Sequence, residues 1–382
     1  MTLSATERER YSRHLLLPEI GAAGQERLKA ARVLVVGAGG LGSPASLYLA
    51  AAGVGTLGIV DHDRVDLSNL QRQLLFDTAS VGAGKAVTAQ ARLQALNPEI
   101  NVVAHELELR AANALELLGA YDCIVDGSDR LDTRYLVNDA CVLLGRPLVS
   151  AAIHRFEGQA MTYLPGQGPC YRCLFPESAA GVAPNCAEAG VLGVLPGMLG
   201  ALQATEAIKL LLNIGAPLVG RLMTYDALAM EWREFRFRRR TDCAVCGAAP
   251  TITTLADSAA SCATDAPARW PRVNAGELRQ LLDGTGGAGG APVSAPTIVD
   301  VREVHEFQAG HLDGSVNIPL GDLARRIGEL PAQAPVVFVC RSGRRSQTAC
   351  ELSARAGGQR VADLEGGLLA WAATVDSSIK VV

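Results

Sequence analysis

A glycine-rich turn between two apolar patterns limits the folds open to this chain. Gly37-Ala38-Gly39-Gly40-Leu41-Gly42 fits the pattern G-x-G-x-x-G, and it follows the apolar run 32–37 and precedes the helical pattern 43–52. Glycines let the backbone approach a phosphate, and a helix N-terminus supplies unpaired N–H groups. The turn therefore predicts a strand, a phosphate-binding loop and a helix.

The same alternation of strands and helices continues along the first 150 residues. Further strands are predicted at 56–61, 101–104, 123–126 and 147–151, and helices at 85–96, 133–144 and 199–212. Strands that alternate with helices are typical of a parallel, doubly wound sheet. We therefore predict a Rossmann-like α/β fold here. The uncharged stretch 33–60 belongs to this pattern and not to a membrane span, because its glycines interrupt it.

A change in composition after Cys246 predicts two domains. Residues 250–269 are rich in Ala, Thr, Ser and Pro and poor in large apolar side chains, which is typical of a flexible linker. We expect one domain at 1–249 and a smaller α/β domain at 270–382. The second domain has strand-like segments at 297–301 and 336–340 and a helical segment at 276–282.

The charge of the chain excludes some classes of partner. The formal net charge is −4, so no overall positive field attracts nucleic acid or an anionic membrane. The first ten residues are charged and lack the apolar core of a signal peptide. We expect a cytoplasmic protein without nucleic-acid or membrane partners.

Charged residues near the glycine turn distinguish between nucleotides. Asp61 ends the second predicted strand, where it can accept hydrogen bonds from ribose hydroxyls. The polar segment 66–73 follows it and contains Arg72, while Lys85 and Asp129 come later. A triphosphate needs cations and a metal ligand near its tail, and a hydride-transfer site does not. The pattern favours ATP, and an NAD-dependent oxidoreductase is the alternative.

Four of the ten cysteines form two Cys-x-x-Cys pairs. Cys170 and Cys173 make the first pair, and Cys243 and Cys246 make the second. Two such pairs complete the tetrahedral sulfur coordination that suits Zn²⁺, and four protein ligands leave no open position. We therefore predict one structural zinc per chain, which joins distant parts of the first domain. Without a secretory signal, metal binding is favoured over disulfides.

Cys340 follows a predicted strand and is a candidate nucleophile. It begins the loop Cys340-Arg341-Ser342-Gly343-Arg344-Arg345, and a helical pattern starts at Ser346. Backbone N–H groups, a helix N-terminus and three arginines would favour a thiolate there. A phosphatase loop needs arginine six residues after the cysteine, where this chain has Ser346. The shorter loop therefore suits a persulfide better than a phosphate ester.

The remaining cysteines give weaker signals. Cys186 lies between Pro184 and Gly190, which suggests a loop with an accessible thiol, although a structural role is the simpler interpretation of the residues alone. The other four lack any such context, and we expect them in the core or the linker: Cys123, Cys141, Cys262 and Cys350.

Four segments of the first domain resemble the MoeB/ThiF family, relatives of the ubiquitin-activating enzymes. They are Arg10-Tyr11-Ser12-Arg13-His14, Val36-Gly37-Ala38-Gly39-Gly40-Leu41-Gly42, Leu67-Ser68-Asn69-Leu70-Gln71-Arg72-Gln73 and Pro169-Cys170-Tyr171-Arg172-Cys173. The resemblance covers about 10–247. It implies a zinc site at the four paired cysteines and a covalent role for Cys186.

The same resemblance implies a set of ATP and Mg²⁺ contacts. Many relatives have Asp-Asn where this chain has Asp129-Arg130. Arg13 would reach the phosphates bound by the neighbouring subunit of a homodimer. The implied contacts are Gly40, Asp61, Ser68, Asn69, Leu70, Gln71, Arg72, Lys85, Asp129 and Arg130, with Arg72 and Asp129 taking part in catalysis.

The second domain resembles a single rhodanese domain. The resemblance rests on Ile298-Val299-Asp300-Val301-Arg302-Glu303, Gly310-His311-Leu312-Asp313-Gly314-Ser315-Val316-Asn317-Ile318-Pro319 and Leu364-Glu365-Gly366-Gly367-Leu368-Leu369-Ala370-Trp371. It implies that Cys340 carries sulfur as a persulfide.

Together the two resemblances imply an adenylyltransferase and sulfurtransferase. The partner would be a small ubiquitin-like sulfur-carrier protein of the MoaD/ThiS type, ending in Gly-Gly. The sulfur donor would be a cysteine desulfurase persulfide or thiosulfate. The pathway stays open among molybdopterin, thiamine, cysteine, tRNA thiolation and siderophores. The rival interpretations are an NAD-dependent oxidoreductase with an accessory rhodanese domain, a zinc-binding module without enzyme activity, and an activator for ubiquitin-like conjugation.

Overall fold

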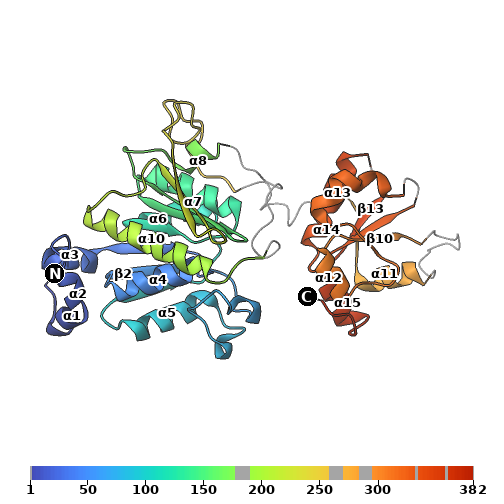
Figure 1. The fold of residues 1–382 in the computed structure, drawn as a ribbon, viewed down its shortest axis with the longest axis horizontal. Coiled ribbons are helices and arrows are strands. Elements are labelled where there is room, and N and C mark those ends of the chain that lie inside the picture. The colour runs from blue at the N-terminus through green and yellow to red at the C-terminus, as the bar shows by residue number, and fades with distance from the viewer. Residues whose placement is uncertain are drawn as a thin grey trace. The chain divides into compact units, whose positions relative to one another are not determined.

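The computed structural model describes residues 2–176, 190–257, 270–283, 295–331, 334–357 and 360–381. The chain forms two compact units, Met1–Thr264 and Asp265–Val382 (Figure 1). Each unit has its own sheet and its own buried core, so each is described by itself.

The first unit is built on a mixed sheet of eight strands in the order β3-β2-β1-β4-β5-β6-β7-β8. The first five are parallel, as predicted, and the last three continue the sheet in antiparallel fashion. In chain order the strands are Arg32–Val36, Thr56–Val60, Asn101–His105, Cys123–Asp126, Leu148–His154, Glu157–Tyr163, Arg221–Asp226 and Glu231–Arg236. The predicted α/β class is confirmed, but the antiparallel extension was not predicted. Its last strand, β8, is exposed along its whole length and lacks an apolar pattern.

Helices cover both faces of this sheet. One buried cluster includes residues of α3, α4, α5 and α10, and another includes residues of α6 and α7. Helices α4 and α10 lie side by side over one face (Figure 1). The helices are α1 Ala5–Arg10, α2 Ser12–Leu15, α3 Gly21–Ala30, α4 Gly42–Ala51, α5 Lys85–Leu96, α6 Ala111–Gly119, α7 Leu131–Leu144, α8 Tyr171–Leu174 and α10 Leu195–Leu212, with short 3-10 turns η1 Leu67–Asn69 and η2 Thr78–Ser80.

The helix predicted at 199–212 begins four residues earlier, at Leu195. Pro196 occupies its first turn, where the fixed φ of proline suits a helix and its missing N–H is not needed. The uncharged stretch 33–60 forms β1, α4 and β2. Within the described ranges, no helix has the length and apolar character needed to cross a membrane.

The beginning of the expected linker packs against the first unit. Ile252 and Leu255 are partly buried against the cluster that includes residues of α6 and α7. Asp257 accepts a hydrogen bond from the backbone N–H of Ala111 at 2.8 Å, so it caps the first turn of α6 from a distant part of the chain. Residues 258–269 lie outside the described ranges.

The second unit has a parallel sheet of five strands in the order β11-β10-β12-β13-β9. Buried clusters on its two faces separate it from solvent. The strands are β9 Arg272–Val273, β10 Thr297–Asp300, β11 Val316–Asn317, β12 Val336–Val339 and β13 Val361–Leu364; the helices are α11 Ala275–Leu282, α12 Val304–Ala309, α13 Leu320–Arg326, α14 Arg344–Arg355 and α15 Gly367–Thr374, with a 3-10 turn η4 Ile327–Glu329.

Candidate nucleotide, metal and sulfur-transfer sites

The glycine turn connects the buried end of β1 to the N-terminus of α4. Gly37 has a φ of +85°, and its N–H donates to the carbonyl of Val60 at 2.8 Å. A β-carbon on Gly42 would lie 1.8 Å from the carbonyl oxygen of Gly37, so glycine is required at that position. The turn is therefore tight and presents the N-terminus of α4 at the carboxyl edge of the parallel strands.

Asp61 fixes the glycine turn to the end of β2. Its Oδ2 accepts from the backbone N–H of Ala38 and its Oδ1 accepts from that of Asp63, both at 2.8 Å. Burial raises the pKa of Asp61, and the nearby ammonium of Lys85 opposes this rise only in part. Asp61 therefore orients the loop amides as well as offering oxygen atoms to a ligand.

The segment after β2 lies directly beside the glycine turn. A β-carbon on Gly40 would lie 3.6 Å from Cδ of Arg72, and one on Gly39 would lie 3.8 Å from Nε2 of Gln73. Arg72 donates to the carbonyl of Ser68 at 3.0 Å, which holds its side chain along this segment. The structure thus brings Arg72, one of the predicted residues, to Gly40. Gln73, which the sequence did not single out, is buried, and its Oε1 accepts no hydrogen bond from the described residues.

Lys85 begins α5 and is buried beside the end of β2. Its Nζ lies 3.0 Å from Oδ2 of Asp63, an ion pair that the sequence did not predict. The carboxylates of Asp61 and Asp63 and a ring nitrogen of His62 lie within 4.8 Å of one another. A phosphate that reaches Lys85 would therefore have to compete with Asp63 for the ammonium.

The loop after β4 adjoins the glycine turn and carries Asp129. A β-carbon on Gly127 would lie 2.8 Å from the backbone nitrogen of Gly42, so the two loops touch. Asp129 is exposed in this loop. Arg134 of α7 holds this loop, because its guanidinium donates to the carbonyl of Ser128 at 2.7 Å. No local pattern pointed to Arg134, because its contact depends on the folded loop.

The two remaining predicted arginines lie in different settings. Arg130 precedes α7 and pairs with Glu108 at 3.4 Å, in a small pocket that Asp257 also lines. This partner was not predicted, and no nucleotide contact is needed to explain the position of Arg130. Arg13 is exposed on α2, as a residue that serves a neighbouring subunit would have to be.

The beginning of α10 and the residues just before it also contact the glycine turn and the segment after β2. A β-carbon on Gly40 would lie 3.2 Å from Pro196, and one on Gly193 would lie 2.4 Å from the carbonyl oxygen of Gln71. These contacts span more than 100 positions of the chain, so no local pattern could have revealed them. Cys186, predicted to be catalytic, lies outside the described residues.

The four paired cysteines converge in a buried cluster. The Sγ atom of Cys170 lies 3.9 Å from that of Cys173 and 3.6 Å from that of Cys243. The Sγ atoms of Cys173 and Cys246 are 3.4 Å apart. Sulfur atoms bound about 2.3 Å from a tetrahedral Zn²⁺ are separated by about 3.8 Å, close to these spacings. The backbone N–H of Arg240 also donates to the sulfur of Cys173 at 3.4 Å. The cluster therefore fits a structural zinc ion.

The sulfurs of this cluster share hydrogen bonds. The hydrogen bond between Cys170 and Cys173, together with burial, raises the pKa of Cys170, whereas the same hydrogen bond lowers the pKa of Cys173. A divalent cation bound here would hold all four sulfurs as thiolates.

Residues between the first two cysteines tie the cluster to α7. Arg172 makes two hydrogen bonds to the carboxylate of Asp139, at 2.7 and 2.8 Å, and its guanidinium lies 4.6 Å from the ring centre of Tyr135. The backbone N–H of Tyr171 donates to Oδ1 of Asn138 at 2.8 Å. The helix that follows Asp129 is therefore fixed to the four-cysteine cluster.

In the second unit, Cys340 follows β12 and its sulfur faces the first turn of α14. The backbone N–H of Gly343 donates to its Sγ at 3.1 Å, and Oγ of Ser346 lies 3.6 Å away. Gly343 has a φ of +89°, which lets the loop turn and starts the helix at Arg344, two residues before the predicted position. The carbonyl of Cys340 accepts from the N–H of Leu368 at 2.8 Å. Cys340 as a residue is only 1% exposed.

The arginines of this loop do not act alike, contrary to the expectation that all three strengthen its positive field. Arg341 is exposed. Arg345 is paired with Glu306 of α12, whose carboxylate offsets its charge.

Among the other cysteines, Cys123, Cys141 and Cys350 are buried, and burial raises the pKa of each, in keeping with core residues. Cys262 lies outside the described residues.

Comparisons with known proteins find relatives for the segment with the glycine turn and for the segment with the Cys340 loop. Residues 11–245 match the ThiF family, and residues 275–374 match the rhodanese-like domain. The probable adenylyltransferase/sulfurtransferase MoeZ of Mycobacterium tuberculosis is 45% identical over 382 residues, which cover 97% of this chain and 94% of that protein. The adenylyltransferase and sulfurtransferase MOCS3 of Anopheles gambiae is 44% identical over 403 residues, covering 99% of this chain and 90% of that protein.

Two further relatives match the first unit. The sulfur carrier protein adenylyltransferase of Thermus thermophilus is 54% identical over 268 residues, covering 69% of this chain and 99% of that protein. The crystal structure of Escherichia coli MccB with ATP matches with a TM-score of 0.56 and 26% identity, over 64% of this chain and 75% of that chain.

Proposed function

The chain belongs to the ThiF family and carries a rhodanese-like domain, and from this premise we propose that it adenylylates the C-terminal glycine of a small ubiquitin-like sulfur-carrier protein and then transfers sulfur to it. One observation supports this most strongly: the same chain holds a glycine turn beside Arg72 and a cysteine loop headed by Cys340. The first suits a nucleotide phosphate, and the second suits a reactive sulfur.

In the proposed first reaction, the carrier's terminal carboxylate attacks the α-phosphate of ATP. The bond to the β-phosphate breaks, pyrophosphate leaves with the electron pair, and the carrier becomes an acyl-adenylate. Arg72 and Lys85, with Arg13 of the partner subunit, would stabilise the negative charge that develops on the phosphates. Asp129 would hold Mg²⁺, which when bound neutralises part of the phosphate charge.

In the proposed second reaction, the thiolate of Cys340 attacks the outer sulfur of a donor. The donor is a cysteine desulfurase persulfide or thiosulfate; its sulfur–sulfur bond breaks, and Cys340 becomes a persulfide. The terminal sulfur then attacks the carrier's acyl carbon and displaces AMP. A second thiol, which we assign to Cys186, attacks the sulfur of Cys340, and the carrier leaves as a thiocarboxylate. The disulfide that this leaves between Cys186 and Cys340 is then reduced by an external thiol.

The proposal includes one Zn²⁺ held by Cys170, Cys173, Cys243 and Cys246.

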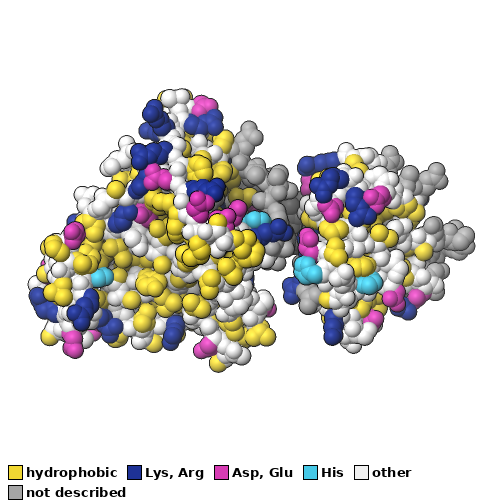
Figure 2. All heavy atoms as spheres, in the orientation of Figure 1, with side chains coloured by type: hydrophobic (Ala, Val, Ile, Leu, Met, Phe, Trp, Pro, Cys, Tyr) yellow, Lys and Arg dark blue, Asp and Glu magenta, His cyan; other side chains and the backbone are white. Residues whose placement is uncertain are grey.

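The proposal also includes a homodimer. Apolar side chains gather over α4 and α10 (Figure 2), where Tyr48 and Met198 are exposed. An exposed apolar surface of this kind is typical of a subunit interface and supports the dimer. The cytoplasmic location stays a prediction from the sequence.

Exchange of labelled pyrophosphate into ATP tests this function. We expect exchange that depends on a carrier ending in Gly-Gly, because formation of the acyl-adenylate is reversible. An NAD-dependent oxidoreductase, the main rival, would bind NAD and show no exchange. A carrier whose last glycine is removed is the matched control, since it keeps the folded carrier but lacks the reacting carboxylate in the right place.

A further inference from the structure

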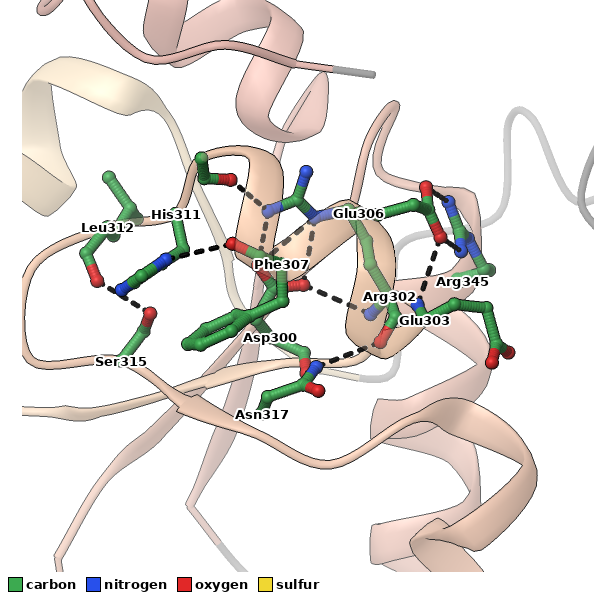
Figure 3. A network of polar contacts seen from close by, with 11 residues as sticks. Asp300, Arg302, Glu303, Glu306, Phe307, His311, Leu312, Ser315, Asn317 and Arg345 are labelled. Atoms are coloured by element: carbon green, nitrogen blue, oxygen red, sulfur yellow. Dashed lines mark hydrogen bonds and ion pairs between the residues drawn. The ribbon is translucent and has the colours of Figure 1, made fainter.

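An ion pair between Glu306 and Arg345 closes the far end of the Cys340 loop. Arg345 lies in the first turn of α14, and Glu306 lies on α12, 39 positions earlier. Two guanidinium nitrogens donate to the two carboxylate oxygens at 2.6 and 2.7 Å (Figure 3). The side chains are only 10% and 11% exposed. A buried pair with two parallel hydrogen bonds fixes orientation as well as position.

Glu306 is itself held by the residue that precedes its own helix. Its Oε2 accepts from the backbone N–H of Glu303 at 2.9 Å. Just before Glu303, the guanidinium of Arg302 binds the carboxylate of Asp300 at 2.7 to 3.1 Å, and both are fully buried (Figure 3). Asp300 ends β10 and is paired in register with Val339, the residue before Cys340. A continuous set of contacts therefore joins the two ends of the loop.

The loop between these ends must keep a particular shape for its amides to reach the sulfur. The carbonyl of Cys340 is fixed by Leu368, and the N–H of Gly343 points at the Cys340 sulfur at 3.1 Å. A β-carbon on Gly367 would lie 2.6 Å from the nitrogen of Gly343, so the layer below leaves the loop little room. A shift at Arg345, two residues after Gly343, would be transmitted to this amide.

We propose that Glu306 is a positioning residue for sulfur transfer: through Arg345 it holds the loop so that the Gly343 amide faces the Cys340 sulfur. The inference rests on the proposed function of Cys340 as the sulfur-carrying residue. Glu306 does not touch the reacting sulfur. Its contribution is to keep the N–H groups in place as the thiolate forms and as the persulfide is consumed.

The test is sulfur transfer from thiosulfate to cyanide by the full-length protein. The Cys340 thiolate attacks the outer sulfur of thiosulfate and sulfite leaves; cyanide then attacks the terminal sulfur of the persulfide and leaves as thiocyanate, which regenerates the thiolate. Two variants are measured. Glu306→Asp keeps the charge but shortens the side chain, and the double variant Glu306→Leu with Arg345→Met replaces the pair by apolar side chains. Glu351→Gln is the matched control, because it removes the carboxylate of an exposed ion pair, that with Arg355, on the same helix α14.

We expect both variants to lower kcat by about tenfold to a hundredfold, since small misplacements of catalytic groups have effects of that size. The KM for thiosulfate should stay within about twofold, because ground-state binding does not depend on the Gly343 amide alone. Apolar replacement of a buried ion pair is often neutral for stability, so the double variant should melt near the wild-type temperature. Glu351→Gln should transfer sulfur like the wild type.

The outcomes separate this inference from the function on which it rests. A folded double variant with wild-type kcat would mean that the pair serves stability only, and the inference would be wrong. The same conclusion would follow if the double variant failed to fold and Glu306→Asp kept wild-type kcat. A wild-type protein that transfers no sulfur, or a Cys340→Ala variant that still does, would instead contradict the proposed function.

Discussion

The glycine turn 37–42 and the cysteine loop 340–345 occupy equivalent places in two different sheets. Each connects the carboxyl end of a parallel strand to the N-terminus of a helix. The glycine turn carries no reactive side chain, and the groups around it come from separate segments that begin at Asp61, Lys85, Gly127 and Gly193. The cysteine loop carries its own nucleophile and is supported by neighbours such as Glu306.

This difference follows from what each site must hold. A nucleotide triphosphate is large and highly charged, so its ligands have to converge from many elements. A sulfur atom on a cysteine needs only a few amides within one turn. We therefore expect single substitutions to separate the two activities cleanly.

Arg72→Ala and Asp129→Ala should each reduce acyl-adenylate formation by about a hundredfold to a thousandfold, because the first removes a positive charge at the phosphates and the second removes the proposed Mg²⁺ ligand. Sulfur transfer from thiosulfate by Cys340 should be unchanged in the same preparations. Pyrophosphate exchange and thiocyanate release are the two measurements. Loss of both activities in a folded variant would show that the two units do not work as separate modules.

Cys243→Ser should lower the free energy of unfolding of the first unit by several kcal/mol, because binding of a structural metal is part of the folding free energy. Zinc content should fall below one ion per chain, while the thermal transition of the second unit stays in place. Elemental analysis and calorimetry measure these two quantities. Wild-type protein purified without zinc would contradict the metal assignment.

Gly42→Ala should weaken ATP binding and reduce adenylylation, because its β-carbon would lie 1.8 Å from the carbonyl oxygen of Gly37 and the turn would have to open. The matched control is Gly197→Ala in α10, where a β-carbon meets nothing within 4 Å. That control should be neutral or raise stability by about 0.5–1 kcal/mol, the usual gain for alanine over glycine inside a helix. Equal ATP affinity in the two variants would argue against the glycine turn as the nucleotide site.

Asp257→Ala should have the smallest effect. Loss of the cap on α6 should lower the stability of the first unit by about 1 kcal/mol. Pyrophosphate exchange should be unchanged, since Asp257 caps α6 and has no part in the proposed reaction. Thermal melting detects the change, with Asp242→Asn, an exposed aspartate near the four-cysteine cluster, as a comparison.

The sequence predicted those parts of the molecule that depend on local pattern. The helix at 85–96 and the strand at 123–126 appear with the predicted bounds, and the two Cys-x-x-Cys pairs converge as their chemistry required. Among the three antiparallel strands that were missed, β8 is exposed on both sides and has no apolar alternation. That strand therefore had no period by which to be recognised.

Functional contacts that depend on distant segments could not be predicted. Pro196 meets Gly40, and Asp63 pairs with Lys85, only after the sheet has formed. The pairing of Arg345 with Glu306 could not be predicted either, so the positive charge expected for the Cys340 loop was too high. In each case the residue type was present in the sequence, but its partner was set by the tertiary fold.

Mass spectrometry of the carrier protein tests the central claim most directly. The carrier is incubated with ATP, thiosulfate and either the wild-type protein or its Cys340→Ala variant. Wild type should replace one oxygen of the carrier's terminal carboxylate by sulfur, because the Cys340 persulfide displaces AMP. Cys340→Ala should form the acyl-adenylate but no thiocarboxylate. Thiocarboxylate formed by Cys340→Ala at the wild-type rate would contradict the account, because sulfur would then reach the carrier without the second unit.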